Sequence, residues 1–270
     1  MTARDLLNGL VLEDGRRWGD AAHAFQRGDA DAVLAGETPN HFLTRPRGDS
    51  KTTDLAGMNI VVGLVQAPPR ARMYSLAADE KQGRLLVDAM HGFQTRTPEL
   101  RNALSVRESS VYFNRTQARV EVLPADSASI WGLRPYFVTV DEIGQWHATP
   151  PPQRCWEAVS TAAVKVPESR LVVLTTASDP AHWSRAVRDH ALDDPLWRVH
   201  EVPGPPHWLD PACLDGERRR LPESSYRRLF LNEWAASEDR LADEEDLQAC
   251  VTLDGPLEPR PEVRYELATR

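Results

Sequence analysis

The chain has 270 residues, 41% of them hydrophobic and 27% charged, proportions typical of a globular protein with one sizeable α/β domain. A net charge of −8 and a pI near 5.5 exclude a protein that coats nucleic acid by bulk positive charge, so any DNA contact has to come from a local patch. No apolar run approaches the roughly 20 residues of a membrane helix, and the N-terminus does not resemble a secretory signal. The three isolated cysteines follow no metal-ligand spacing, which favours inert thiols in a reducing cytosol.

Helical spacing of apolar residues alternates with short apolar runs along the chain, and glycine or proline marks most of the breaks. The expected elements are a helix over 14–34, a strand over 41–44, a helix over 55–66, a strand over 71–77, a helix over 79–93, a hairpin over 110–123, a strand over 136–140, a helix over 154–164 preceded by a triple-proline break, a strand over 171–177, and helices over 211–221 and 223–234. This order predicts an α/β fold with a mostly parallel sheet and helices on both faces.

A proline-rich stretch after Val202 predicts a domain boundary. We expect a core over 1–202, a small helical lid or linker subdomain over 203–256, and a linker over 257–270.

A polar turn between the strand over 41–44 and the next helix has the context of a phosphate-binding loop. It matches G-x-x-x-x-G-K-[ST] only in part, because Arg45 and Ser50 stand where the glycines belong, and Asp49 adds a carboxylate. Lys51 would reach the β- and γ-phosphates, and the Thr52 hydroxyl would ligate Mg²⁺. The alternative is a basic surface turn. The candidate nucleotide-binding residues are Arg45, Pro46, Arg47, Gly48, Asp49, Ser50, Lys51 and Thr52.

Two acidic residues end the apolar strand FVTV. Buried carboxylates are costly unless they are paired or used, so Asp141 is a candidate Mg²⁺ ligand and Glu142 a candidate catalytic base for water. The 90 residues between Lys51 and Asp141 leave room for further strands, as in ATPases with an inserted central strand. Thr175 and Thr176 end the next strand and are candidates to sense the γ-phosphate, or they simply cap the strand. Three such motifs in this order predict an ATP-binding motor or switch.

The chain resembles the N-terminal ATPase domain of phage terminase large subunits. The resemblance covers about residues 15–250 and is strongest from Asp126 to Trp146, which includes VTVDEIGQWH. Other matching features are an arginine, Arg47, four residues before the loop lysine, a helix with Gln26 upstream of the loop, and LTTASDPAHW after the acidic strand.

The resemblance implies a P-loop NTPase of the ASCE type that hydrolyses ATP with Mg²⁺ to translocate double-stranded DNA into a procapsid. In the family, Gln26 would read adenine, Arg47 would act near the γ-phosphate, and Thr175 and Thr176 would couple hydrolysis to movement. The implied partners are double-stranded viral DNA, the portal protein and the terminase small subunit. We expect a homo-oligomeric ring when the motor is assembled, with a monomer in isolation as the alternative. The expected location is the host cytoplasm, transiently at the portal, with no membrane.

Further arginines are candidates for contacts between subunits or with DNA. Arg101, Arg119 and Arg134 are candidates for an arginine donated to a neighbouring active site. The run 218–220, with Arg227 and Arg228, either contacts DNA or the portal or forms a solvated helix face.

The family's C-terminal nuclease domain would start where this sequence stops, so we expect no nuclease activity. The alternatives to a packaging motor are another nucleic-acid motor, such as a helicase, or a degenerate P-loop module that binds nucleotide without hydrolysing it.

Overall fold

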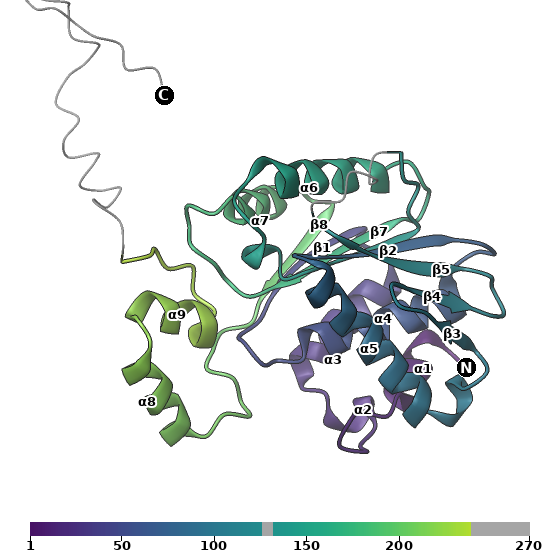
Figure 1. The fold of residues 1–270 in the computed structure, drawn as a ribbon, viewed down its shortest axis with the longest axis horizontal. Coiled ribbons are helices and arrows are strands. Elements are labelled where there is room, and N and C mark those ends of the chain that lie inside the picture. The colour runs from purple at the N-terminus through teal and green to yellow at the C-terminus, as the bar shows by residue number, and fades with distance from the viewer. Residues whose placement is uncertain (126–131, 239–270) are drawn as a thin grey trace, which may run out of the picture. The chain divides into compact units, whose positions relative to one another are not determined.

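An eight-stranded sheet runs through the centre of the computed structural model, which describes residues 1–125 and 132–238 (Figure 1). The strand order is β3-β4-β5-β2-β6-β7-β1-β8. In this order, each neighbouring pair in the series β5-β2-β6-β7-β1-β8 is parallel. Strands β3 and β4 add an antiparallel edge next to β5. The strands are β1 (Asn40–Thr44), β2 (Arg72–Ala77), β3 (Leu104–Val106), β4 (Ser110–Phe113), β5 (Arg119–Pro124), β6 (Phe137–Asp141), β7 (Arg170–Thr175) and β8 (Trp197–Glu201).

Helices cover both faces of this sheet, and a separate apolar cluster fills each side. The larger cluster includes residues of α1, α3, α4 and α5, and the smaller one includes residues of α6 and α7. The α-helices in the described residues are α1 (Ala3–Gly9), α2 (Trp18–Ala21), α3 (Ala24–Ala35), α4 (Lys51–Val61), α5 (Glu80–Arg96), α6 (Pro150–Ala163), α7 (Ser184–Asp193), α8 (Pro211–Arg220) and α9 (Glu223–Leu231). The expected fold class is therefore confirmed.

Strand register brings the sequence motifs to one edge of the sheet. Thr44 at the end of β1 pairs with Thr175 of β7 on one side and Glu201 of β8 on the other. Asp141 of β6 pairs with Leu174 of β7. Because parallel strands end at the same edge, the segments that follow β1, β6 and β7 lie close together.

Several element boundaries differ from the expectations. The helix expected over 14–34 is divided into α2 and α3, with His23 in extended backbone at the start of α3. The prolines at 150–152 lie in the first turn of α6 rather than before it, because proline suits helix positions whose N–H groups have no partner. Helix α1 and strands β3 and β8 were not expected.

The division into domains that the sequence predicts falls partly on residues outside the described ranges. Residues 1–236 form one compact unit that includes α8 and α9. The predicted lid over 203–256 lies partly outside the described residues and the linker over 257–270 entirely so, and both stay predictions. Among residues 1–125 and 132–238, no helix is long and apolar enough to cross a membrane.

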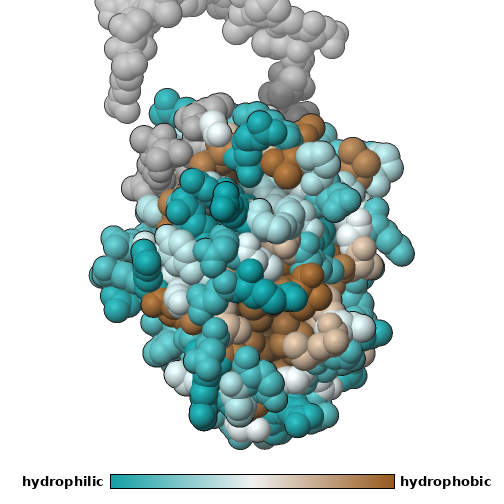
Figure 2. Space-filling model, turned by 90° about the vertical axis from the view of Figure 1, so that its right-hand side faces the viewer, coloured by the Kyte–Doolittle hydropathy of each residue, from teal (hydrophilic) through white to brown (hydrophobic). Residues whose placement is uncertain are grey.

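The face in Figure 2 is mostly hydrophilic around a patch of apolar side chains.

Candidate active site

The loop between β1 and α4 is held by backbone contacts with two other elements. The Arg45 N–H donates to the carbonyl of Thr175 at 2.9 Å, and the Arg47 N–H donates to the carbonyl of Leu229 in α9 at 2.7 Å. Gly48 and Ser50 both adopt left-handed backbone, with φ of 85° and 53°. Ser50 immediately precedes the first turn of α4, so the turn leads directly into a helix N-terminus.

Lys51, the first residue of α4, is buried beneath this loop. Its Nζ donates to the carbonyl oxygens of Pro46 at 2.9 Å and Arg45 at 3.3 Å. The same ammonium lies 3.1 Å from Oε1 of Glu142. The loop lysine and the acidic strand end, predicted separately from sequence, therefore meet.

Asp141 and Thr52 lie beside this pair. The Thr52 hydroxyl donates to Oδ2 of Asp141 at 2.7 Å, and Oδ1 of Asp141 is buried and has no hydrogen-bond partner among the described residues. Burial, with the nearby charge of Glu142, raises the pKa of Asp141 to about 7, although Thr52 and Lys51 oppose the shift. A cation would stabilise the ionised carboxylate and give Oδ1 a partner, so these oxygens fit a Mg²⁺ ion.

Glu142 adopts left-handed backbone at φ 51°, which directs its carboxylate toward the end of β7. Oε2 accepts from the Thr176 N–H at 2.9 Å and the Thr175 hydroxyl at 3.3 Å. The Thr176 hydroxyl donates to Oε1 at 3.4 Å. Both threonines of the predicted coupling motif thus contact the predicted catalytic carboxylate.

The side chain of Arg45 lies behind the loop rather than at its surface. Its guanidinium is buried, 3.1 Å from Asp29 and in an ion pair with Asp54. These two carboxylates belong to α3 and α4, and the buried Arg45 Nε has no hydrogen-bond partner in the described structure. The side chain ties the loop to the helices beneath it and is not exposed at the loop surface.

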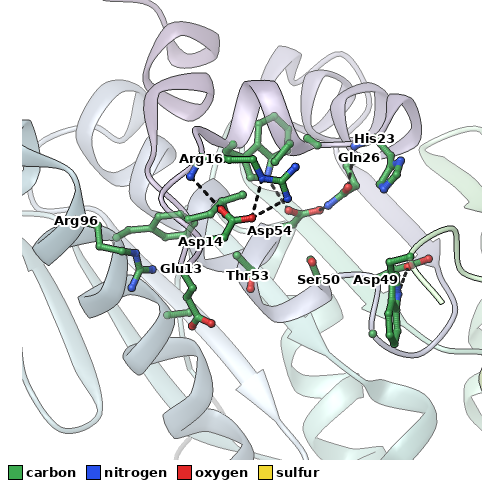
Figure 3. A pocket seen from close by; sticks show the side chains of 18 residues that line it. Glu13, Asp14, Arg16, His23, Gln26, Asp49, Ser50, Thr53, Asp54 and Arg96 are labelled. Atoms are coloured by element: carbon green, nitrogen blue, oxygen red, sulfur yellow. Dashed lines mark hydrogen bonds and ion pairs between the residues drawn. The ribbon is translucent and has the colours of Figure 1, made fainter. Parts of the chain in front are cut away.

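Gln26 lines a cavity of about 390 Å³ whose lining does not include Asp141 (Figure 3). Its Nε2 donates to Asp54 at 2.9 Å and its Oε1 accepts from the His23 N–H at 2.9 Å. Trp18 also donates to Asp54, at 2.7 Å. The predicted adenine-reading amide is thus present at a cavity but is engaged by the protein.

Asp49, Gly48 and Trp208 also line this cavity. The Trp208 indole N–H donates to Asp49 at 3.1 Å, and burial raises the pKa of Asp49. A Cβ on Gly48 would lie 2.3 Å from the Trp208 ring, so only glycine permits this approach. Trp208 was not predicted as a site residue, because a tryptophan in a proline-rich stretch has no motif of its own.

Arg47 is exposed and lines a second cavity, of about 430 Å³, with Asp141, Glu142 and Thr176. The expected role of Arg47 beside a γ-phosphate stays a prediction. Sequence reasoning missed Asn232, whose buried amide contacts Thr44 and Ala177, because a single asparagine after a helix carries no signal of such a role.

The arginines expected to act between subunits are spread over the molecule. Arg119 pairs with Glu121 at 2.6 Å. Arg101 and Arg134 are exposed, and Arg134 precedes β6, at the opposite end of the strand from Asp141.

In the basic run, Arg220 pairs with Glu217, and Arg218 pairs with Glu223. Arg227 and Arg228 pair with Glu233 and Asp179. These ion pairs favour the solvated helix face over a phosphate-binding patch.

Several solved structures share this fold. The HK97 bacteriophage large terminase superposes with a TM-score of 0.72 and 19% identity, covering 86% of this chain and 55% of that one. The chain has the fold of a large terminase ATPase domain. The ATPase domain of the Thermus phage P74-26 large terminase gives a TM-score of 0.59 at 12% identity, covering 76% of this chain and 92% of that one. The large terminase of a thermophilic bacteriophage in complex with ATP-γ-S gives 0.59 at 12% identity, covering 74% of this chain and 48% of that one.

At these identities the likeness concerns the fold, and the chain spans about half the length of the HK97 protein. No family model and no curated protein matches the sequence.

Proposed function

We propose that this chain is the ATP-hydrolysing motor domain of a viral DNA-packaging terminase large subunit. The observation that carries the proposal is the cluster at the carboxyl edge of the sheet, where Lys51 meets Glu142 and Thr52 meets Asp141. The fold shared with large terminases, one of them in complex with ATP-γ-S, supports ATP as the substrate.

The two cavities suggest how ATP lies across the loop. The base would occupy the cavity beside Gln26, and the terminal phosphate would lie near Arg47 and Glu142 in the second cavity. Lys51 would exchange its contacts with the loop carbonyls and Glu142 for phosphate oxygens. Glu142, held by the end of β7, would then orient and polarise the attacking water.

Asp141 and the Thr52 hydroxyl would hold Mg²⁺, which neutralises developing phosphate charge. Arg47 would contribute positive charge at the γ-phosphate. Thr175 and Thr176 would register its loss through their bonds with Glu142.

The remaining parts of the proposal concern assembly. The substrate moved would be double-stranded viral DNA, with the portal protein and the terminase small subunit as partners in the host cytoplasm. The working form would be a homo-oligomeric ring, and residues 203–256 would act as a lid. The fold similarity to the HK97 and P74-26 large terminases supports this setting.

Steady-state ATP hydrolysis tests the proposal, with Mg²⁺, double-stranded DNA and high protein concentration to favour assembly. Lys51→Ala and Glu142→Gln should each lower kcat by about 100-fold or more, since each removes a group that acts on the reacting phosphate. Glu233→Gln, an exposed carboxylate paired with Arg227, is the matched control and should leave the rate unchanged. Wild-type protein that turns over no ATP under these conditions would refute the motor.

One observation favours a second candidate, a module that binds nucleotide without hydrolysis. Asp49 places a carboxylate in the loop, and Lys51 is engaged by that same loop. ATP-γ-S binding by a wild-type protein that shows no turnover would select this candidate.

A further inference from the structure

Asn232, the residue directly after helix α9, is buried and makes three hydrogen bonds through one side-chain amide. Its Nδ2 donates to the Thr44 hydroxyl and to the Val202 carbonyl, both at 2.8 Å. Its Oδ1 accepts from the Ala177 N–H at 2.9 Å. The backbone is left-handed, with φ 55° and ψ 38°, a conformation that asparagine tolerates better than most residues.

The three partners follow or end neighbouring strands of the sheet. Thr44 ends β1 and directly precedes the phosphate loop. Ala177 follows Thr176, whose N–H holds the Glu142 carboxylate at 2.9 Å. Val202 follows β8, and its N–H donates to the Thr44 carbonyl at 2.9 Å. A single amide therefore joins the β7, β1 and β8 ends at the edge that carries the site.

The last turn of α9 is bonded to the same region through its backbone. The carbonyl of Leu229 accepts from the Arg47 N–H at 2.7 Å, and the carbonyl of Leu231 accepts from the Gly204 N–H at 3.0 Å. A Cβ on Gly204 would lie 1.9 Å from the Phe230 carbonyl oxygen, so the two segments pack backbone to backbone. Helix α9 cannot move as a unit without changing contacts to the loop that would bind phosphate.

We propose that Asn232 is a positioning residue that transmits a change at the Glu142–Thr176 contact to helix α9 and from there to helix α8. The two helices are in contact, because Arg218 of α8 pairs with Glu223 and lies over the Tyr226 ring of α9. The inference rests on the proposed ATPase function. A γ-phosphate that draws Lys51 away from Glu142 alters the charge facing the carboxylate that holds Thr176. The next peptide N–H, that of Ala177, is bonded to Asn232, so a shift of this strand end displaces the start of the segment after α9.

A reporter on α8 measures this transmission directly. Cys213 lies on α8 and is exposed, while Cys155 is buried, so an environment-sensitive fluorophore can be attached at Cys213 in a Cys250→Ser background. The labelled 270-residue chain is titrated with Mg²⁺ and either ATP-γ-S or ADP. Nucleotide affinity is measured separately by calorimetry. The wild-type reporter should respond differently to saturating ATP-γ-S and to saturating ADP.

Two substitutions of Asn232 separate transmission from folding. Asn232→Gly removes all three side-chain bonds and keeps the left-handed backbone without strain. It should bind ATP-γ-S within about threefold of the wild type, while the difference between the ATP-γ-S and ADP responses falls about fivefold or more. Asn232→Asp keeps an acceptor for the Ala177 N–H and loses donation to Val202, so it should retain an intermediate response.

Trp234→Phe is the matched control, because it removes a bond from the same segment to Glu201 at 3.0 Å without touching the site. It should keep the full response. A full response in Asn232→Gly at saturation would overturn the inference, as would a wild-type chain that binds both nucleotides with identical reporter signals. If Asn232→Gly does not fold, the reporter response of Asn232→Asp decides. The inference is overturned if that response equals the wild-type response, and also if it equals the signal of a chain without nucleotide. A wild-type chain that binds no nucleotide refutes the proposed function itself, and this inference with it.

Discussion

The buried guanidinium of Arg45 gives the sharpest test of how the loop is built. Arg45 is 1% exposed and lies between Asp29 and Asp54, which are 0% and 2% exposed. Arg45→Met removes the cation and leaves the carboxylates in the interior. Asp29 keeps His200 at 2.6 Å and Arg198 at 3.6 Å.

Asp54 would be left with neutral donors only among the contacts described for it. The indole of Trp18 and the amide of Gln26 remain, at 2.7 Å and 2.9 Å, but no cation does. Breaking a buried ion pair in this way costs about 3–5 kcal/mol. Because Asp29 is still compensated, we expect the lower end, about 3 kcal/mol, which lowers Tm by roughly 6–12 °C for a chain of this size.

Thermal unfolding of a double-mutant cycle measures this. Asp54→Asn in the Arg45→Met background removes the uncompensated charge and should recover part of the lost stability, with a coupling of about 1–3 kcal/mol. Strict additivity, or an Arg45→Met protein with wild-type Tm, would refute the buried ion-pair account. The double variant should also bind ATP-γ-S within about threefold of wild type. A much larger loss would instead support Arg45 as a direct nucleotide ligand, as the sequence pattern suggests.

The remaining predictions concern charge and protonation. Asp49→Asn removes a buried carboxylate from the loop and should tighten ATP-γ-S binding about fivefold, as measured by calorimetry. A weaker affinity in this variant would show that Asp49 contributes to nucleotide binding instead. Trp208→Phe removes the donor to Asp49 and should weaken nucleotide affinity in the wild type but not in Asp49→Asn, since the indole N–H partly offsets the carboxylate charge. Burial lowers the pKa of His41 from 6.5 to about 4, so the unfolded chain binds the proton that the folded one refuses, and the contribution of His41 to stability falls as pH falls from 6.5 to 4. Asp141, whose folded pKa is raised to about 7, contributes with the opposite sign, so the test compares the wild type with a His41 variant. The His41 shift amounts to about 3 kcal/mol at ~1.36 kcal/mol per pKa unit, so the Tm of His41→Gln should rise relative to that of the wild type as pH falls from 6.5 to 4, and a Tm difference independent of pH would refute this.

The parts of the site that the sequence predicted are those in which a short segment carries both its structure and its chemistry. FVTVDE is an apolar strand with two acids at its end, and LTTA is a strand with hydroxyls at its end, so each motif indicates its own position at the sheet edge. Parallel pairing then brings Asp141, Glu142 and Thr175 together without further information.

The parts that were missed depend on contacts between distant segments. Strand β8 has intermediate burial at every position and mixes Trp, Arg, Val, His and Glu, so it shows neither an apolar run nor clean alternation. Asp29 and Asp54 become partners of Arg45 only after α3 and α4 have packed. Asn232 lies 188 residues from Thr44 in the chain, and no spacing rule connects the two.

The unusual sequence of the loop has a structural explanation in these distant contacts. A glycine-rich phosphate loop adopts left-handed backbone at little cost, whereas Ser50 at φ 53° costs on the order of 1–2 kcal/mol. Bonds from elsewhere hold the loop in compensation, because Thr175 and Leu229 accept from its N–H groups and Arg45 anchors it to the helices below. The loop conformation is therefore imposed by β7, α9 and the buried ion pairs, and the same contacts would make it respond to changes in those elements.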